Sequence, residues 1–217
     1  MGKLILFGGT GGLGTKLKPL FDVDYDVVSL GSKDVNVINF QEVKDFFQEV
    51  DSADVVISLV GYNYDSLICR VDEYGIENLY KIIDVTIKGN LNIVTNCIPY
   101  MRENGFGRVI LMSSILSSKV VKGTSVYSAS KSFVDTLVRN IAFENCDKNI
   151  TCNSIQLGYF DGGMAHRLPE KFKEKLLDTI PRKRLGQIKE LKDTIDFIIN
   201  NEYLTGQNIK VAGGVEF

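Results

Sequence analysis

The chain has 217 residues, 44% of them hydrophobic and 24% charged, and its formal net charge at pH 7 is −2. These values predict one globular α/β domain, and the weak acidic balance argues against nucleic-acid partners, which need a basic surface. No apolar run approaches the ~20 residues of a membrane span, so we expect no membrane association. The four cysteines are scattered, which argues against a metal site or a disulfide framework and favours a cytoplasmic protein.

The chain opens with a short apolar run, residues 4–7, that leads directly into a glycine-rich segment, residues 8–14. A helix-compatible stretch follows, so this region predicts a strand, a glycine turn and a helix. Glycines permit positive φ angles and close backbone approach, which lets the turn amides and the helix N-terminus receive a pyrophosphate. A P-loop fits less well, because a threonine separates the last glycine from the lysine.

Further apolar runs alternate with helix-like stretches along the chain, which is the pattern of repeated βαβ units and predicts a parallel sheet. The predicted strands are residues 4–7, 26–30, 35–38, 55–60, 109–112, 150–156 and 209–211. Two long helices are predicted at residues 76–102 and 126–146. Only residues 31–34 separate the second predicted strand from the third, which leaves no room for a helix between them.

Tyr127 and Lys131 are four residues apart on the second long helix, so their side chains lie on one face, a turn apart. A nearby ammonium group lowers the pKa of a phenol from its ordinary value of ~10, which makes the phenol a general acid or base. Ser114 follows a buried strand, where its hydroxyl can polarise a carbonyl group. These three residues are the predicted catalytic groups.

The glycine spacing Gly8-x-x-x-Gly12-x-Gly14, followed in order by Ser114, Tyr127 and Lys131, resembles the short-chain dehydrogenase/reductase family, and within it the compact 3-oxoacyl-carrier-protein reductases. Residues 152–158 and 203–214 resemble the family's nicotinamide loop and closing segment. The resemblance implies a Rossmann-like, doubly wound parallel sheet with three α/β/α layers, formed by residues 1–217 as a single domain. It also implies an NAD(P)(H)-dependent oxidoreductase that interconverts a carbonyl and an alcohol.

The resemblance also implies a set of cofactor contacts. They are Gly8, Thr10, Gly11, Gly12, Leu13, Gly14, Asn36, Val37, Gly61, Tyr127, Lys131, Gly158 and Phe160. Ser32 and Lys33 follow the second strand and offer a hydroxyl and a cation to a 2′-phosphate, so we expect NADP(H) rather than NAD(H). Asp34 would instead face the ribose if that strand ends later, and Lys33 is equally compatible with an ordinary solvated turn.

Two positions depart from the family pattern. The sequence Ser58-Leu-Val-Gly61 stands where the family usually has Asn-Asn-Ala-Gly, which alters the side chains that brace the cofactor loops. Thr86 stands where an asparagine normally positions a proton-relay water. Since a threonine has no amide, we expect slower or rerouted proton delivery rather than loss of the chemistry.

Residues 159–186 are expected to form a substrate lid, with Gly162 and Gly163 as its hinge. Residues 166–192 hold nine Lys or Arg against four acids, so two readings stay open: a carbonyl substrate carried on an acidic or phosphate-bearing group, or a solvated amphipathic face. His166, the only histidine, is expected to be a surface or lid residue. The family resemblance implies that the two long helices form the faces of a homodimer or homotetramer.

Two other functions remain open at this point. A cofactor-binding regulatory or scaffold protein is compatible with Thr86 and the altered loop, although the intact catalytic set counts against it. A redox-neutral epimerase of the extended branch would share the Tyr-Lys pair, but only 86 residues follow Lys131 here. Net consumption of NADPH would separate the oxidoreductase from both alternatives.

Overall fold

The computed structural model describes residues 1–163 and 170–215, and its centre is one parallel sheet of six strands in the order β2-β1-β3-β4-β5-β6. The strands are β1 (Lys3–Phe7), β2 (Asp26–Leu30), β3 (Val55–Ser58), β4 (Gly107–Ser114), β5 (Ile150–Leu157) and β6 (Asn208–Val211). The helices are α1 (Gly14–Phe21), α2 (Phe40–Glu49), α3 (Val71–Tyr74), α4 (Ile76–Ile82), α5 (Gly89–Asn104), α6 (Ser125–Asn145), α7 (Glu170–Thr179) and α8 (Ile188–Asn200).

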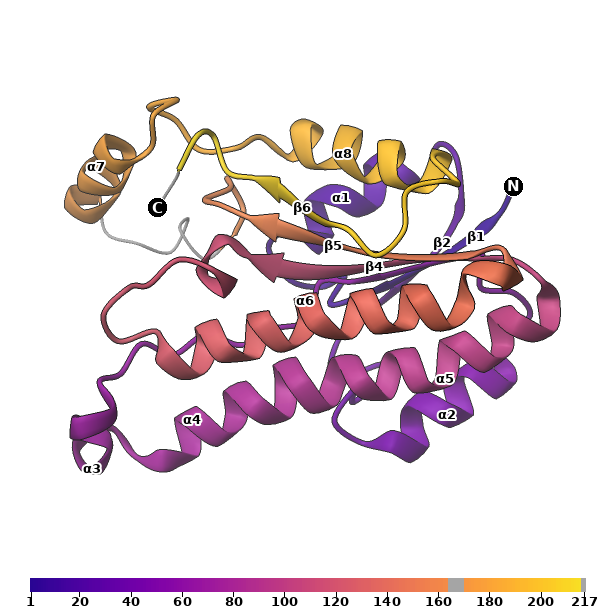
Figure 1. Cartoon of the computed structure of the whole chain (residues 1–217), viewed down its shortest axis with the longest axis horizontal. Helices are drawn as coiled ribbons and strands as arrows, with labels where there is room; N and C mark the ends of the chain where they lie inside the picture. The colour runs from indigo at the N-terminus through magenta and orange to yellow at the C-terminus, as the bar shows by residue number, and fades with distance from the viewer. Residues whose placement is uncertain (164–169, 216–217) are drawn as a thin grey trace.

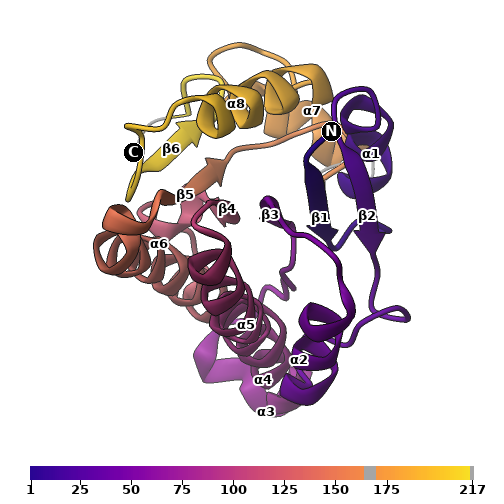
Figure 2. The same ribbon diagram turned by 90° about the vertical axis from the view of Figure 1, so that its right-hand side faces the viewer.

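Helices cover both faces of the sheet, as the two views in Figures 1 and 2 show, with α1 and α8 on one side and α2, α5 and α6 on the other. The two cores follow from the alternation of side chains along each strand. In β1, Ile5 and Phe7 pack in the core beneath α2, α5 and α6, whereas Leu4 and Leu6 pack beneath α1 and α8. The expected three-layer, doubly wound sheet is therefore confirmed.

The strand order reverses direction at the centre of the sheet, because β2 lies on one side of β1 and β3 on the other. The connections that leave β1 and β3 consequently diverge to opposite faces, which opens a crevice beyond the carboxyl ends of these strands. In open α/β sheets, ligands bind in this crevice.

The strand predicted at residues 35–38 is wrong, because this segment is a turn that leads into α2. The Val35 amide donates to the carbonyl oxygen of Gly31, and the Asn39 amide donates to that of Asn36. The Asn39 side chain then caps α2 by accepting the amide of Gln41 at 3.0 Å. Turn and cap bonds therefore use the backbone groups that a strand would need, and β2 becomes the edge of the sheet.

Both predicted long helices are present, but the first is interrupted by one π-helical segment, η2 (Ile83–Lys88), between α4 and α5. This first helix ends at Asn104, two residues beyond the predicted end, and Gly105 after it takes the left-handed conformation with φ 67°. Within the described residues, no helix is long and apolar enough to cross a membrane. The four cysteines are free thiols, and of these Cys69 and Cys146 are exposed.

Candidate active site

A cavity of about 490 Å³ opens at the carboxyl ends of β1, β3, β4 and β5, in the crevice where the strand order reverses. It brings together eleven of the predicted site residues. They are Gly8, Gly11, Gly12, Leu13, Gly14, Gly61, Ser114, Tyr127, Lys131, Gly158 and Phe160. Segments from four separate loops and from α6 therefore meet in one cavity.

The glycine turn forms one end of the cavity, and its shape depends on the lack of side chains. Gly8 has a φ of 77°, which favours glycine. A Cβ atom on Gly14 would lie 2.5 Å from the Cα atom of Gly9, and one on Gly12 would collide with the carbonyl oxygen of Gly162. The turn leads directly into α1, so the N-terminus of this helix lies at the glycine turn.

Ser114 is the last residue of β4 and is 7% exposed. Its hydroxyl oxygen accepts the amide of Leu116 at 3.1 Å, and this bond caps the short helix η3 (Ile115–Ser117) that follows. The cap holds the serine side chain at the point where the strand enters the cavity. The hydroxyl hydrogen remains free to turn toward a ligand or toward the phenol of Tyr127.

Tyr127 and Lys131 lie together on α6 and are both buried, with 5% and 4% of their surfaces exposed. Burial raises the pKa of Tyr127 to about 12, a hydrogen bond from Ser114 acts in the opposite direction, and the charge of Asp65 adds to the rise. The Lys131 ammonium donates to the Met112 carbonyl oxygen at 2.8 Å and lies 5.8 Å from the centre of the Tyr127 ring. The expected lowering of the Tyr127 pKa by Lys131 is therefore wrong, because the loss of water around the phenol dominates.

Burial also lowers the pKa of Lys131, to about 8, and the carboxylate of Asp135 opposes this effect. Asp135 is buried one helical turn beyond Lys131. Its two oxygens accept hydrogen bonds from Ser154 at 2.8 Å and from Gln156 at 2.7 Å. The sequence analysis did not single out this acid. Its spacing of four from Lys131, on the same helix face, was the signal for it.

Asn90 is a second residue that the sequence analysis did not single out, and it ties the π-helical segment to the loop after β3. Its amide donates to the carbonyl oxygens of Thr86 at 2.7 Å and Val60 at 3.5 Å, and its side-chain oxygen accepts the Ser58 hydroxyl at 2.7 Å. The Thr86 hydroxyl oxygen accepts the amide of Tyr62 at 3.2 Å. Thr86 and Asn90 thus brace the loop that carries Gly61.

This braced loop lies directly against Lys131. A Cβ atom on Gly61 would lie 2.9 Å from the Lys131 ammonium and 3.8 Å from the Thr86 hydroxyl. The position of the loop therefore limits where the ammonium can sit. The loop that stands in place of the family's Asn-Asn-Ala-Gly motif is therefore still held by side-chain hydrogen bonds, and here Ser58, Thr86 and Asn90 make them.

Five predicted cofactor residues do not line the cavity: Thr10, Ser32, Lys33, Asn36 and Val37. Thr10 packs over Gly31, where its side chain would collide with any Cβ atom. Val37 packs against Gly89, and the Asn36 amide donates to Glu42 at 2.9 Å. Ser32 and Lys33 are exposed on the loop that follows β2.

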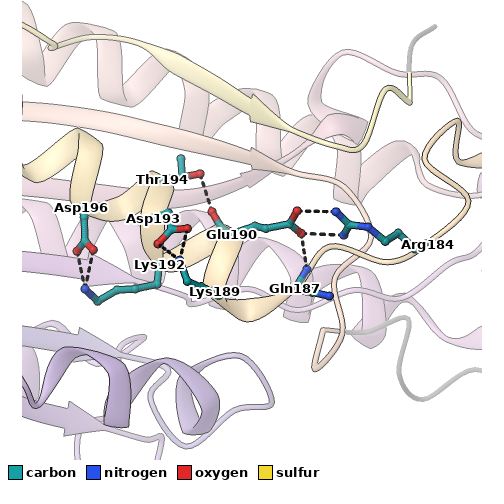
Figure 3. Close-up of polar contacts among 8 residues, drawn as sticks. All are labelled: Arg184, Gln187, Lys189, Glu190, Lys192, Asp193, Thr194 and Asp196. Atoms are coloured by element: carbon teal, nitrogen blue, oxygen red, sulfur yellow. Dashed lines mark hydrogen bonds and ion pairs between the residues drawn. The ribbon is translucent and has the colours of Figure 1, made fainter.

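Three of the basic residues between 166 and 192 are paired with acids within the described part of the chain (Figure 3). Arg184 binds Glu190 through two nitrogen–oxygen contacts of 2.6 and 2.9 Å, and this pair lowers the pKa of Glu190 to about 2. Lys189 pairs with Asp193 at 2.8 Å, and Lys192 pairs with Asp196 at 2.6 Å.

These ion pairs neutralise three of the nine basic residues that were counted in this segment. Other predicted lid residues cannot be placed in the same way. His166 and Arg167 lie outside the described residues, and the side chains of residues 170–173 are not described either.

Comparison with known proteins is consistent with this site. The family model described as enoyl-(acyl carrier protein) reductase matches residues 29–216. The 3-oxoacyl-[acyl-carrier-protein] reductase FabG of Staphylococcus epidermidis is 31% identical over 186 residues, which cover 83% of this chain and 75% of that protein. FabG of Rickettsia felis is 28% identical over 202 residues, or 92% of this chain and 82% of that protein.

Solved structures show the same fold. The structure described as ElxO with NADP bound superposes with a TM-score of 0.87 at 18% identity, and the match covers 99% of this chain and 98% of that one. A structure described as a small-chain dehydrogenase has a TM-score of 0.86 at 22% identity, with 98% and 97% covered. Together with the family model and the FabG relatives, these findings show that the chain belongs to the short-chain dehydrogenase/reductase family of NAD(P)-dependent oxidoreductases.

Proposed function

We propose that this protein is an NADP(H)-dependent oxidoreductase that interconverts a carbonyl and an alcohol, with Tyr127 as the general acid or base. The observation that carries the proposal is the meeting of Ser114, Tyr127 and Lys131 in one cavity with the glycine turn. The FabG relatives, which are named as 3-oxoacyl reductases, support the same reaction class.

The residues present fit a dinucleotide. The glycine turn leaves no room for side chains, and it faces the N-terminus of α1, an arrangement that suits a pyrophosphate. Exposed Ser32 and Lys33 suit a 2′-phosphate. Asp34 is the acid that would favour NAD, but its carboxylate accepts the backbone amide of Gly31 at 2.7 Å. This bond directs the Asp34 charge toward its own turn and supports NADP(H).

In the reductive direction, bound NADPH would supply a hydride to the carbonyl carbon. Ser114 would donate a hydrogen bond to the carbonyl oxygen, and Tyr127 would give that oxygen its proton. The raised pKa of Tyr127 keeps the phenol protonated at neutral pH, as this role requires. Lys131, with its pKa lowered to about 8, is still mainly charged at neutral pH and would stabilise the phenolate that remains.

The finer identity of the partners is also part of the proposal. We take the substrate to be a small-molecule carbonyl or alcohol, with residues 159–186 as the lid and the cytoplasm as the location. The names of the FabG relatives support a carbonyl attached to an acidic carrier. The pairing of Arg184, Lys189 and Lys192 with acids gives that alternative less support from the described surface. A homodimer or homotetramer is supported by exposed apolar residues on α4 and α5.

Substitution of Tyr127 by Phe tests the proposed reaction. Tyr127→Phe removes the proton donor and leaves the ring packing intact, so we expect turnover to fall by about a thousandfold or more while NADPH binding is retained. Turnover is measured as NADPH absorbance with a panel of ketones and aldehydes, and binding is measured as NADPH fluorescence.

The matched control is Tyr80→Phe, because Tyr80 is 53% exposed on α4 and lies outside the cavity lining. Turnover by the Tyr127→Phe protein at the wild-type rate would show that the role assigned to Tyr127 is wrong. If the wild-type protein binds NADPH but does not oxidise it in the presence of any carbonyl compound of the panel, a regulatory or redox-neutral protein would be favoured instead.

A further inference from the structure

Besides the glycine turn, the cavity is lined by polar side chains from three loops. Asn63 and Asp65 come from the loop after β3, Thr124 precedes α6, and Tyr159 follows β5. A substrate held against Ser114 and Tyr127 would contact these side chains. Their chemistry therefore indicates which substrates the site accepts.

Asn63 presents an unpaired acceptor here. Its side-chain oxygen is buried, and no hydrogen-bond partner for it exists among the described residues. Buried polar atoms are almost always hydrogen-bonded, because a buried acceptor without a partner destabilises the folded state. Asn63 itself lines the cavity, and a small turn of its side chain toward the cavity would offer this oxygen to a donor on a ligand.

Asp65 adds a second acceptor, which is charged. Its charge raises the pKa of Tyr127 on α6 and that of Tyr159 after β5, in both cases as a smaller effect than burial. Two phenols from different elements therefore sense the same carboxylate, which places it beside the catalytic end of the cavity. Of the described residues that line the cavity, Asp65 is the only acid and Lys131 the only base.

Lys131, the only cationic side chain among the described residues that line the cavity, is not available to balance an anionic group on a substrate. The Lys131 ammonium is buried and donates to the Met112 carbonyl oxygen. The nearby basic residue Arg184 is engaged by Glu190. The described substrate end thus carries the Asp65 carboxylate and the Asn63 oxygen as acceptors beside the hydroxyls of Thr124 and Tyr159. With Lys131 engaged, the Asp65 charge attracts hydrogen-bond donors and repels anions.

We propose that Asp65 and Asn63 are specificity-determining residues that accept hydrogen bonds from a donor group on the carbonyl substrate. The substrate class is then a carbonyl compound with a hydroxyl or protonated amine near the reacting carbon, rather than one with a carboxylate there. This inference rests on the proposed function for the reaction itself, and it adds the chemical class of the substrate.

The test uses three methyl ketones of equal chain length that end in a hydroxyl, in a methyl group and in a carboxylate. For the wild-type protein with NADPH, we expect kcat/KM for the hydroxyl-ended ketone to exceed that for either other ketone by about tenfold or more. Asp65→Asn should raise kcat/KM for the carboxylate-ended ketone relative to the others. Asn63→Ala should reduce the preference for hydroxyl over methyl.

The matched control is Asp72→Asn, because Asp72 is an exposed acid on α3 outside the cavity lining, and this variant should keep the wild-type preference. Equal kcat/KM values for the three ketones in the wild-type protein would overturn the inference. A preference that Asp65→Asn and Asn63→Ala leave unchanged would overturn it as well.

Binding is measured separately so that failure of the inference differs from failure of the proposed function. The dissociation constants of the three ketones are determined on the NADPH-loaded Tyr127→Phe protein by quenching of NADPH fluorescence. A preference for the hydroxyl-ended ketone that disappears with Asp65→Asn supports the inference, even if no ketone is turned over by the wild-type protein. Turnover without any such preference in binding or in kcat/KM overturns the inference and leaves the proposed function standing.

Discussion

At the scale of single residues, the pair Tyr127 and Lys131 shows the difference between position and chemistry. Their spacing of four on a helix predicts that they lie together, and they do. The spacing also led to the expectation of a lowered phenol pKa, whereas burial raises it. The sign depends on water exclusion by α4 and the loop after β3, which pack against Tyr127, and a pattern within one helix does not contain that information.

The lowered pKa of Lys131 predicts a pH-dependent stability. Below pH ~8 the ammonium is protonated in both folded and unfolded chains, and the cost of burying the charge is present in full. Above the ordinary value of 10.5 both forms are neutral and the cost disappears, so the free energy of unfolding should rise with pH between these values. From about pH 7.5 to 9.5 we expect a contribution on the order of 2 kcal/mol.

Urea unfolding of the wild-type and Lys131→Met proteins at both pH values measures this contribution, since the difference between the two proteins cancels most other titrating groups. The raised pKa of Tyr127 acts in the opposite direction, because the folded phenol keeps its proton, but only above about pH 10. The same pH dependence in wild-type and Lys131→Met proteins would mean that Lys131 keeps an ordinary pKa when folded.

At the scale of elements, the π-helical segment η2 shows how a local departure from the family pattern is accommodated. Thr86 replaces the expected asparagine, and Asn90, one turn later, supplies the amide that bonds both the segment and the loop after β3. π-Helical segments often occur at functional sites. The network therefore links the shape of the helix to the position of Gly61 beside Lys131.

Truncation of Asn90 tests this link against a matched neighbour. Asn92 is also buried on α5, and its amide donates to the Val37 carbonyl oxygen at 2.9 Å, away from the cavity. Asn90→Ala and Asn92→Ala should each lower the free energy of unfolding by about 1–3 kcal/mol. Only Asn90→Ala should also lower kcat/KM, by about tenfold, because the loop beside Lys131 loses its support. Equal kinetic effects of the two substitutions would show that Asn90 has a structural role alone.

At the scale of the whole molecule, an apolar stripe remains uncovered along α4, η2 and α5. Ile76, Tyr80, Ile83 and Leu91 are 41%, 53%, 41% and 42% exposed, and their spacing puts them on one face of the helix. Figure 1 shows α4 leading end to end into α5, as one long helix that runs alongside α6. Exposed apolar stripes of this kind are typical of protein–protein interfaces. Because the family resemblance implies oligomers, we expect a second copy of the chain to cover the stripe.

Charge placed on this stripe should dissociate the proposed oligomer. The double substitution Tyr80→Asp and Ile83→Asp introduces two carboxylates at the proposed interface, so sedimentation velocity should show a shift to the monomer mass. Val23→Asp is the control, because Val23 is 69% exposed in the turn before β2 and lies outside the stripe. An unchanged mass in the double variant would place the interface, if there is one, on another face.

The sequence by itself determined the glycine turn, six of the seven predicted strands, the two long helices, the place of Ser114 at the end of a strand and the shared helix face of Tyr127 and Lys131. These features follow from patterns over a few neighbouring residues and from the rules of parallel sheets. The prediction of a strand at residues 35–38 was wrong, because the hydrogen bonds made by the Gly31 carbonyl oxygen and the Asn39 side chain favour a turn there.

Only the tertiary structure decided the directions of the Tyr127 and Lys131 pKa values, the bracing by Asn90, the pairing of the basic residues after β5 and the place of Asp65 beside the phenols. Each of these depends on burial or charge between residues far apart in the chain. Desolvation and Coulomb interactions act through space, so their strength is set when the elements pack and not by the order of residues.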